Sequence, residues 1–312
     1  MALSLEQLDA FVAAADTGSF STAARRLRRA QSAVSTQVAN LEIDLGLVLF
    51  DRGARYPVLT VAGERLLPEA RVLLERREHL VGVARGLEAG TEARLVLAMD
   101  ELYPEHMIGG LMAEFAAAFP DVEMELLFPL MEDVSRLVLA GTADLGIMWR
   151  QEQLPPLLDF QTLGWVPLKL VCGRDHPLAR QVVTWEELKR HRQLMVATQT
   201  DSEEKKRLRI AAEVWWVESH WVILELVKHG VGWSLVSDHV LAGSSTRPDL
   251  VVPELGFDSG DWPVGLELVW HKQRPRGPAA TWLKNRIARE RIGPMGVEKV
   301  GGKNSPEPPS FF

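Results

Sequence analysis

Apolar residues recur at helical spacing through most of the first ninety positions of this 312-residue chain. They predict an amphipathic helix that begins near Leu5 and ends near Gly18. A second helix is expected to open at Ser19 or Ser21, because a serine hydroxyl can accept from the free N–H groups of a first helical turn. The apolar stripe of this second helix is Phe20, Ala23, Ala24 and Leu27.

A third helix is predicted to begin at Gln31 or Ser32 and to turn a short polar face outward. Its inward side carries Val34, Val38 and Leu41 at helical spacing. The outward side and the preceding junction hold the candidate contacts Arg28, Arg29, Gln31, Ser32, Ser35, Thr36 and Gln37.

Amide and hydroxyl side chains on such a face can read base edges in a major groove, while arginines neutralise phosphates. No acidic residue lies between Thr17 and Leu41, and Arg25 and Arg26 add to the positive charge. The pattern favours a DNA-reading helix-turn-helix. The alternative is an ordinary amphipathic helical hairpin with a solvated basic face.

The segment from Leu47 to Thr60 alternates apolar and polar residues around a Gly-Ala-Arg tip, which predicts a small β-hairpin, or wing. Arg52 and Arg55 on this wing are expected to reach phosphate or the minor groove. Thr60 can cap a long amphipathic helix that runs to about Leu87. Its apolar positions have coiled-coil-like spacing, so we expect them to pack against a second copy of the chain: Leu66, Ala70, Leu73, Leu74, Leu80, Val81, Ala84 and Leu87.

From Gly90 onward, apolar runs alternate with helical patterns, which predicts an α/β domain. Strands at 93–99, 122–128 and 143–149 enclose helices at 104–119 and 132–142 in a βαβαβ unit. The remaining expected strands are 165–173, 193–198, 232–240, 250–256 and 263–271. The remaining expected helices start at Thr184, where Glu187 suggests a capping box, within the charged segment 201–216, at 221–230 and at 280–290.

Length suggests about two domains, at the usual ~150 residues each. The net charge of −7 resides in residues 91–312, because residues 1–90 hold eleven arginines and eleven acidic residues. The local field, and not the overall charge, governs contact with phosphate. The single cysteine, Cys172, excludes an internal disulfide and a thiolate zinc cluster. No signal peptide or run of ~18 apolar residues is present, so we expect a cytoplasmic protein without a membrane span.

The N-terminal motifs resemble those of the LysR-type transcriptional regulators, a bacterial family. The resemblance rests on LxxLxxF from Leu5, SFxxAAxxL from Ser19, QSAVSxQVxxLExxLGxxLFxR from Gln31 and LTxAG from Leu59. Weaker similarities are GTADLGI from Gly141, the run HPLA from His176 and VKHGVG from Val227. Together they cover roughly residues 3 to 290.

The resemblance implies a winged helix-turn-helix domain at 1–61, a linker and dimerisation helix at 62–90, and an effector-binding α/β domain at 91–292. This last domain would have two lobes, like periplasmic binding proteins: lobe I at about 91–161 and 266–292, and lobe II at about 162–265. Residues 293–312 are expected to form a disordered tail. Relatives act as dimers or dimers of dimers, so a homotetramer on double-stranded DNA is expected, with contact to RNA polymerase. Thr36 departs from the arginine or glutamine of many relatives.

By the same resemblance, a small effector binds between the lobes. No other cofactor is expected, and no metal is expected because the eight histidines are scattered. The residues implied are Met99, Asp100, Glu101, Phe128, Trp149, Arg150, Thr198 and Thr200. Where relatives that bind carboxylates often have serine or threonine, this chain has Asp100. We therefore hypothesise a neutral or cationic, partly aromatic effector, with Asp100 or Glu101 as counter-charge and Trp149 as stacking face. The alternative, that either carboxylate caps the helix near Pro104, stays open.

Two other functions deserve comparison with a regulator. A solute-binding receptor would need only the α/β half, and both the missing signal peptide and the helix-turn-helix stand against it. An enzyme would need a catalytic constellation, and no Ser-His-Asp order, glycine-rich phosphate loop or paired carboxylate motif is present. The sequence therefore predicts a DNA-binding regulator and not an enzyme.

Overall fold

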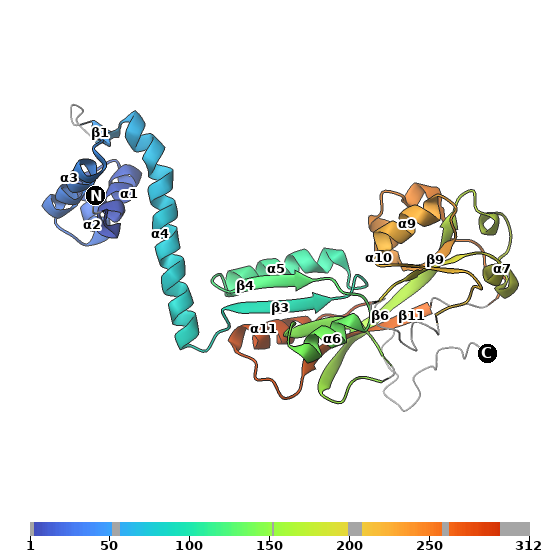
Figure 1. Cartoon of the computed structure of the whole chain (residues 1–312). Coiled ribbons are helices and arrows are strands. Elements are labelled where there is room, and N and C mark those ends of the chain that lie inside the picture. Colours follow the sequence, from blue (N-terminus) through green and yellow to red (C-terminus); the bar gives the residue numbers. More distant parts are fainter. Residues whose placement is uncertain (1–2, 52–56, 152, 199–207, 258–261, 294–312) are drawn as a thin grey trace. The chain divides into compact units, whose positions relative to one another are not determined.

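The chain divides into two compact units, Met1–Ala89 and Gly90–Phe312, which are coloured along the sequence in Figure 1. This computed structural model describes residues 3–51, 57–151, 153–198, 208–257 and 262–293.

Three short helices form the core of the first unit: α1 (Leu5–Thr17), α2 (Phe20–Leu27) and α3 (Gln31–Leu45). Local capping fixes their ends. Ser19 caps α2 by accepting from the Thr22 N–H, and Gly18 and Gly46 end α1 and α3 in the left-handed conformation that glycine tolerates. The apolar stripes predicted from the sequence meet in one cluster around Phe11, Val34 and Leu41. The predicted helices are thus confirmed.

A two-stranded antiparallel wing follows α3. It pairs β1 (Phe50–Asp51) with β2 (Val58–Leu59). The buried Glu42 carboxylate on α3 accepts from the Leu49 N–H at 2.7 Å and the Phe50 N–H at 3.2 Å, which fastens the wing to the helix. The tip of the wing, with Arg52 and Arg55, lies outside the described residues.

The long helix α4 (Val61–Glu88) begins where the sequence predicts it, since the Thr60 hydroxyl accepts from the Gly63 N–H. Two ion pairs hold α4 to α1. Arg71 contacts Asp16 at 2.6 Å, and Arg77 contacts Asp9 at 2.6 Å. The Arg71 hydrogen bond is the main reason that the pKa of Asp16 lies below its ordinary value, despite the opposing effect of burial.

One mixed β-sheet runs through the second unit, in the strand order β4-β3-β5-β11-β6-β9-β7-β8, with β10 beside β6. β3, β4 and β5 are parallel to one another, whereas β11 is antiparallel to both β5 and β6. The strands are β3 (Arg94–Met99), β4 (Glu123–Leu127), β5 (Leu145–Trp149), β6 (Leu158–Gly173), β7 (Gln193–Val196), β8 (Val214–Val217), β9 (Trp233–Ser237), β10 (Leu250–Val251) and β11 (Trp262–His271).

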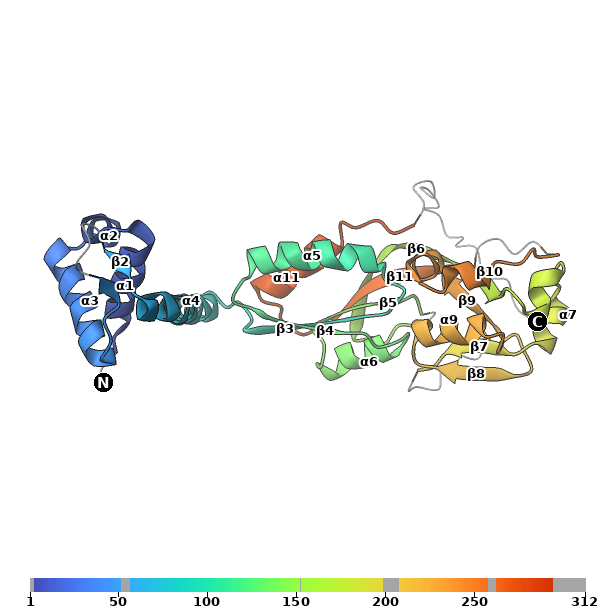
Figure 2. The same cartoon turned by 90° about the horizontal axis from the view of Figure 1, so that it is seen from above.

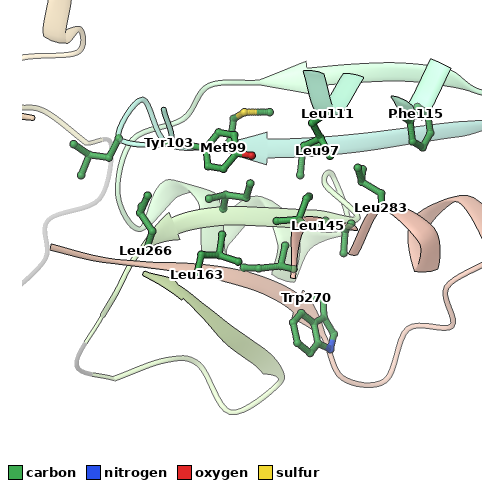
Figure 3. Close-up of a cluster of buried hydrophobic side chains, with 14 of the residues drawn as sticks. Leu97, Met99, Tyr103, Leu111, Phe115, Leu145, Leu163, Leu266, Trp270 and Leu283 are labelled. Carbon is green, nitrogen blue, oxygen red and sulfur yellow. The ribbon is translucent and has the colours of Figure 1, made fainter. Parts of the chain in front are cut away.

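Helices cover both faces of this sheet. In the first lobe, α5 (Glu105–Ala118) and α11 (Pro278–Ile287) pack on one face, and α6 (Asp133–Ala140) packs on the other (Figures 1 and 2). Strand residues alternate between these faces. Figure 3 shows the larger cluster, with Leu97 of β3 near Leu111 and Phe115 of α5. The second lobe is covered by α7 (Trp185–Arg190), α9 (His220–Lys228) and α10 (Asp238–Gly243).

The two lobes share β6 and β11. β11 pairs with β5 in the first lobe, while the far end of β6 pairs with β9 in the second. Between these regions the β6–β11 register shifts at Leu266, opposite Gly164, whose φ is 150°. A Cβ at Gly164 would lie 1.9 Å from the Ile292 carbonyl oxygen, so only glycine fits. Ile292 bonds to both neighbours of Gly164, donating to Leu163 O and accepting from the Trp165 N–H.

Four element predictions need correction. β6 begins at Leu158 and not at 165, and residues 214–217 of the segment expected to be partly helical form β8, paired in parallel with β7. β9 ends at Ser237, because residues 238–243 form α10. The strand expected at 250–256 is reduced to the two residues of β10.

Candidate functional site

The polar face of α3 is exposed, while its apolar face is buried. Val34, Val38 and Leu41 are at most 2% exposed in the core. The five predicted base-reading residues lie together on the outer side of the helix, where all are exposed except the half-buried last one: Gln31, Ser32, Ser35, Thr36 and Gln37. A helix that presents small polar groups in this way can enter a major groove without burying an unpaired charge.

Ser21 of α2 lies beside this face, and the sequence analysis did not select it as a contact. Its hydroxyl donates to the Gln31 side-chain oxygen at 2.7 Å, so α2 holds the first side chain of α3 in place. The N-cap residue Ala30 makes no side-chain hydrogen bond. The first N–H groups of α3 are therefore without a side-chain cap, as suits a helix that approaches a phosphate.

The arginines around the junction differ in their partners. Arg28 is exposed and occupies the turn itself in a left-handed conformation, with φ 55°. Arg29 contacts Glu6 at 3.3 Å, and Arg26 contacts Asp16 at 3.1 Å. Surface pairs of this kind contribute about 0–1 kcal/mol, so DNA phosphates can compete for these guanidinium groups.

Most of the predicted effector residues lie at the edge where β3, β4 and β5 end. Parallel strands present their carboxyl ends at one edge of a sheet, and ligands of α/β proteins bind there. Asp100 follows β3 and is buried. Its carboxylate accepts from the Leu102 N–H at 2.9 Å and from the Met131 N–H at 2.5 Å, so it ties the loop after β3 to the loop after β4.

Burial raises the pKa of Asp100 above its ordinary value, although the nearby His220 and the two N–H groups act in the opposite direction. Each of its two carboxylate oxygens accepts a hydrogen bond from a backbone N–H group. This resembles the capping alternative more than the counter-charge hypothesis, although the bonded N–H groups belong to loops and not to the helix near Pro104.

Glu101 connects the two lobes. Its Oε2 accepts from the His220 N–H at 3.0 Å and lies 2.8 Å from His220 Nδ1, at the start of α9. Its backbone oxygen lies 3.2 Å from His239 Nε2. Burial alone would raise the pKa of Glu101, but the hydrogen bonds and charge of His220 bring it below its ordinary value.

The other predicted effector residues differ in burial and in their contacts. Met99 is completely buried in the core seen in Figure 3, whereas Phe128 is 49% exposed. Trp149 is half-buried at the end of β5, and the neighbouring Arg150 lies 3.7 Å from Glu267. Thr198 is buried and donates to Glu132 Oε1 at 3.0 Å, again across the lobes. Thr200 lies outside the described residues.

Sequence reasoning missed Glu132, His220 and His239. The only signal for Glu132 was its position in the loop after the second strand, four residues beyond Phe128. The two histidines gave no local signal, because their partner Glu101 is more than one hundred residues away.

The described structure holds one buried cysteine, Cys172, and no metal-binding group of three side chains. Among the residues that the structure describes, no three histidine, cysteine or acidic side chains are placed to hold a metal ion. Cys172 is buried, and burial raises the pKa of its thiol to about 11, which disfavours the reactive thiolate. Within the same residues, no helix is both long enough and apolar enough to span a membrane.

Two family descriptions match this chain. "Bacterial regulatory helix-turn-helix protein, lysR family" matches residues 5–64, and "LysR substrate binding domain" matches residues 88–291. The chain belongs to the LysR family. The LysR match includes both the helix-turn-helix and the α/β unit, so this protein is a DNA-binding transcriptional regulator with a small-molecule-binding domain.

Named relatives agree with this assignment. The HTH-type transcriptional regulator AceR of Acinetobacter baumannii is 31% identical over 94% of this chain and 99% of its own length. The uncharacterised HTH-type transcriptional regulator YbhD of Escherichia coli is 28% identical over 85% of this chain and 81% of its own.

Solved structures share the fold of this LysR regulator. A full-length OxyR variant from Pseudomonas aeruginosa has a TM-score of 0.51 at 20% identity, and covers 92% of this chain and 100% of its own. Full-length BenM has a TM-score of 0.50 at 20% identity, and covers 92% and 96%.

Proposed function

We propose that this LysR-type regulator reads its operator with the outer face of α3 and grips phosphates with the surrounding arginines. Base readout falls to Gln31, Ser32, Ser35, Thr36 and Gln37, and phosphate contact to Arg28, Arg29, Arg52 and Arg55. One observation carries the proposal: the side of α3 without charged residues is exposed, while its apolar side fills the core.

The proposed division of labour follows the boundaries predicted above, with DNA binding in 1–61, dimerisation in 62–90 and effector binding in 91–292. The effector binds where the loops after β3, β4 and β5 face lobe II. Support comes from the polar contacts that already cross the lobes there, Glu101 with His220 and Thr198 with Glu132.

Assembly is proposed to use α4. Leu73, Leu80 and Leu87 lie seven residues apart and are 47%, 68% and 59% exposed, as in a coiled-coil seam without its partner helix. Two copies joined in this way would bring two recognition helices to half-sites about one DNA turn apart, ~34 Å, or a multiple of it. We further propose a tetramer of two such dimers, contact with RNA polymerase and a cytoplasmic location.

Selection of bound sequences from random duplex DNA by the full chain tests the proposal. We expect Ser35→Ala and Gln37→Ala to change the preferred bases, and Arg52→Ala to weaken binding to all sequences alike. Asp175→Asn is the control, since Asp175 belongs to the second unit and its side chain is 96% exposed. Unchanged base preferences in both α3 variants would remove this helix face from the readout.

A further inference from the structure

Glu132 is a buried acidic residue beside the boundary between the lobes. Its side chain is on the loop between β4 and α6 and is 8% exposed. Oε1 accepts from the Thr198 hydroxyl of lobe II at 3.0 Å, so the carboxylate reaches the boundary between the lobes. Across the part of the chain that the structure describes, Oε2 has no hydrogen-bond partner.

This arrangement is energetically unfavourable unless something else binds there. Removing a carboxylate from water costs several kcal/mol, and a single hydrogen bond from a neutral hydroxyl recovers only part of that. The acidic neighbours are better compensated: Asp100 binds two N–H groups, Glu101 binds His220, and Asp133 lies 3.2 Å from Arg136.

The backbone beside Glu132 is also held in a costly conformation. Met131 has φ 49°, a left-handed value that a residue with a side chain rarely adopts, and Asp100 fixes its N–H. Strain of this kind persists where the surrounding structure enforces it. Glu132 is the next residue after this fixed position.

Other groups at the same edge suit the remainder of a small organic molecule. Phe128 in the same loop is 49% exposed, and Trp149 ends β5 half-buried. Gln151, two residues after β5, has a buried side-chain nitrogen that donates to no partner in the described structure. Within the described structure, the edge therefore offers a carboxylate oxygen and an amide N–H group without hydrogen-bond partners, together with aromatic surface.

We propose that the effector of this regulator carries a primary ammonium group that binds Oε2 of Glu132 at the boundary between the lobes. The inference rests on the proposed effector site and specifies its ligand class. It assigns the counter-charge to Glu132 in place of Asp100 and Glu101, because both oxygens of Asp100 and Oε2 of Glu101 already have partners. A carboxylate ligand would meet an unpaired negative charge and is disfavoured.

Three ligands that share a benzene ring and differ in charge provide the test: benzylammonium, benzyl alcohol and benzoate, with n-butylammonium as a second cation. Calorimetry on the full chain should detect the cations and not benzoate. Glu132→Gln removes the charge and little volume, and we expect it to weaken cation binding by about tenfold to a hundredfold, as for a hydrogen bond to a charged group. Asp175→Asn, at a carboxylate with a 96% exposed side chain, should leave binding unchanged.

Thermal unfolding without ligand separates a binding role from a structural one. If Glu132 is kept for a ligand, Glu132→Gln should unfold at the same or a higher temperature than the parent chain, because an uncompensated buried charge is removed. A lower unfolding temperature together with unchanged cation binding would assign Glu132 to structure alone and overturn the proposal.

Benzoate binding as tightly as benzylammonium, or neither cation binding at millimolar concentration, would also overturn it. DNA selection with the same preparations keeps the two proposals apart. If the parent chain selects no DNA sequence, the proposed function is refuted. The charge preference among the ligands tests only the ammonium site.

Discussion

Arg28 has two roles: its backbone ends α2, and its exposed guanidinium group lies beside the recognition helix. It ends α2 in the left-handed region, where its N–H bonds to the carbonyls of Ala24 and Arg25, and its side chain is exposed beside the recognition helix. A residue other than glycine costs about 1–2 kcal/mol in this conformation. Arg28 thus occupies the turn against its backbone preference.

Arg28→Gly should therefore stabilise the helix-turn-helix and weaken DNA binding. Relief of the left-handed backbone is partly offset by the greater freedom of glycine in the unfolded chain, which leaves a gain of about 0.5 kcal/mol. Affinity for every DNA sequence should fall, and the salt dependence of binding should decrease by about one phosphate contact. Chemical denaturation and DNA titrations measure the two effects. Arg28→Asn is a matched control for lost charge, and unaltered affinity in both variants would exclude a phosphate contact.

His176 makes the second unit sensitive to acid. The side chain is 5% exposed, accepts from the Leu178 N–H at 3.2 Å, and lies against His191 with ring centroids 4.9 Å apart. Burial, reinforced by His191, lowers the pKa of His176 from 6.5 to about 4. The folded protein thus binds this proton less readily than the unfolded chain does.

Titration of His176 should therefore leave the free energy of unfolding unchanged above pH 6.5 and lower it as the pH falls from 6.5 to about 4. His176→Asn keeps an acceptor for the Leu178 N–H but cannot titrate, so it should reduce this loss by on the order of 2 kcal/mol. Unfolding in denaturant at several pH values measures the difference. His239, whose pKa burial also lowers, accounts for part of the remaining dependence. Identical pH profiles for parent and variant would contradict this role of His176.

The role of a residue could be predicted from the sequence when its partner lies only a few positions away along the chain. Ser19, Thr60 and Thr184 cap helices as predicted, because each hydroxyl binds an N–H three residues further along the chain. Glu132 and Thr198 are 66 positions apart, and their contact depends on how two lobes pack. Residue types and local spacing carry no information about such a pair.

At the scale of elements, β6 shows why a long strand can escape detection. It contains Gly164 and Pro167, residues that normally interrupt strands. Gly164 sits at the register shift, and Pro167 lies opposite Pro263 of β11. The strand continues because the bulge accommodates Gly164 and because β11 places Pro263 opposite Pro167. Local periodicity in the sequence shows neither the bulge nor this pairing.

α4 is the element whose exposed surface most clearly requires a partner. Leu80→Glu should weaken self-association of the full chain by at least about tenfold, because burying a leucine stabilises by ~1.5–3 kcal/mol and a charge in the seam opposes pairing. Sedimentation at several protein concentrations measures this change. His79→Glu is the control, since it adds the same residue one position away from the seam. Equal association of both variants would place the dimer interface elsewhere.

At the scale of the whole molecule, the two-part organisation was predictable because helical and strand periodicities occupy separate stretches of sequence. The relation between the lobes was not. The lobe boundaries expected at 161–162 and 265–266 fall inside β6 and beside the register shift of β11, where two continuous strands serve both lobes.

The contact between Ile292 and the bulge gives a prediction for the chain as a whole. A protein ending at Gly293 retains both backbone hydrogen bonds of Ile292 with Leu163 and Trp165, whereas one ending at Arg291 loses them and exposes the core that Ile292 packs against. We expect the shorter protein to be less stable by about 2–4 kcal/mol. Equal unfolding transitions would show that this contact contributes little.

That contact also decides where foreign sequence can be attached. A fluorescent protein or affinity tag fused beyond Gly293 leaves the hydrogen bonds of Ile292 with Leu163 and Trp165 of β6 intact. The same fusion inserted between Ala288 and Ile292 would detach the backbone from the point where the lobes meet, and would disturb effector sensing while leaving the helix-turn-helix intact.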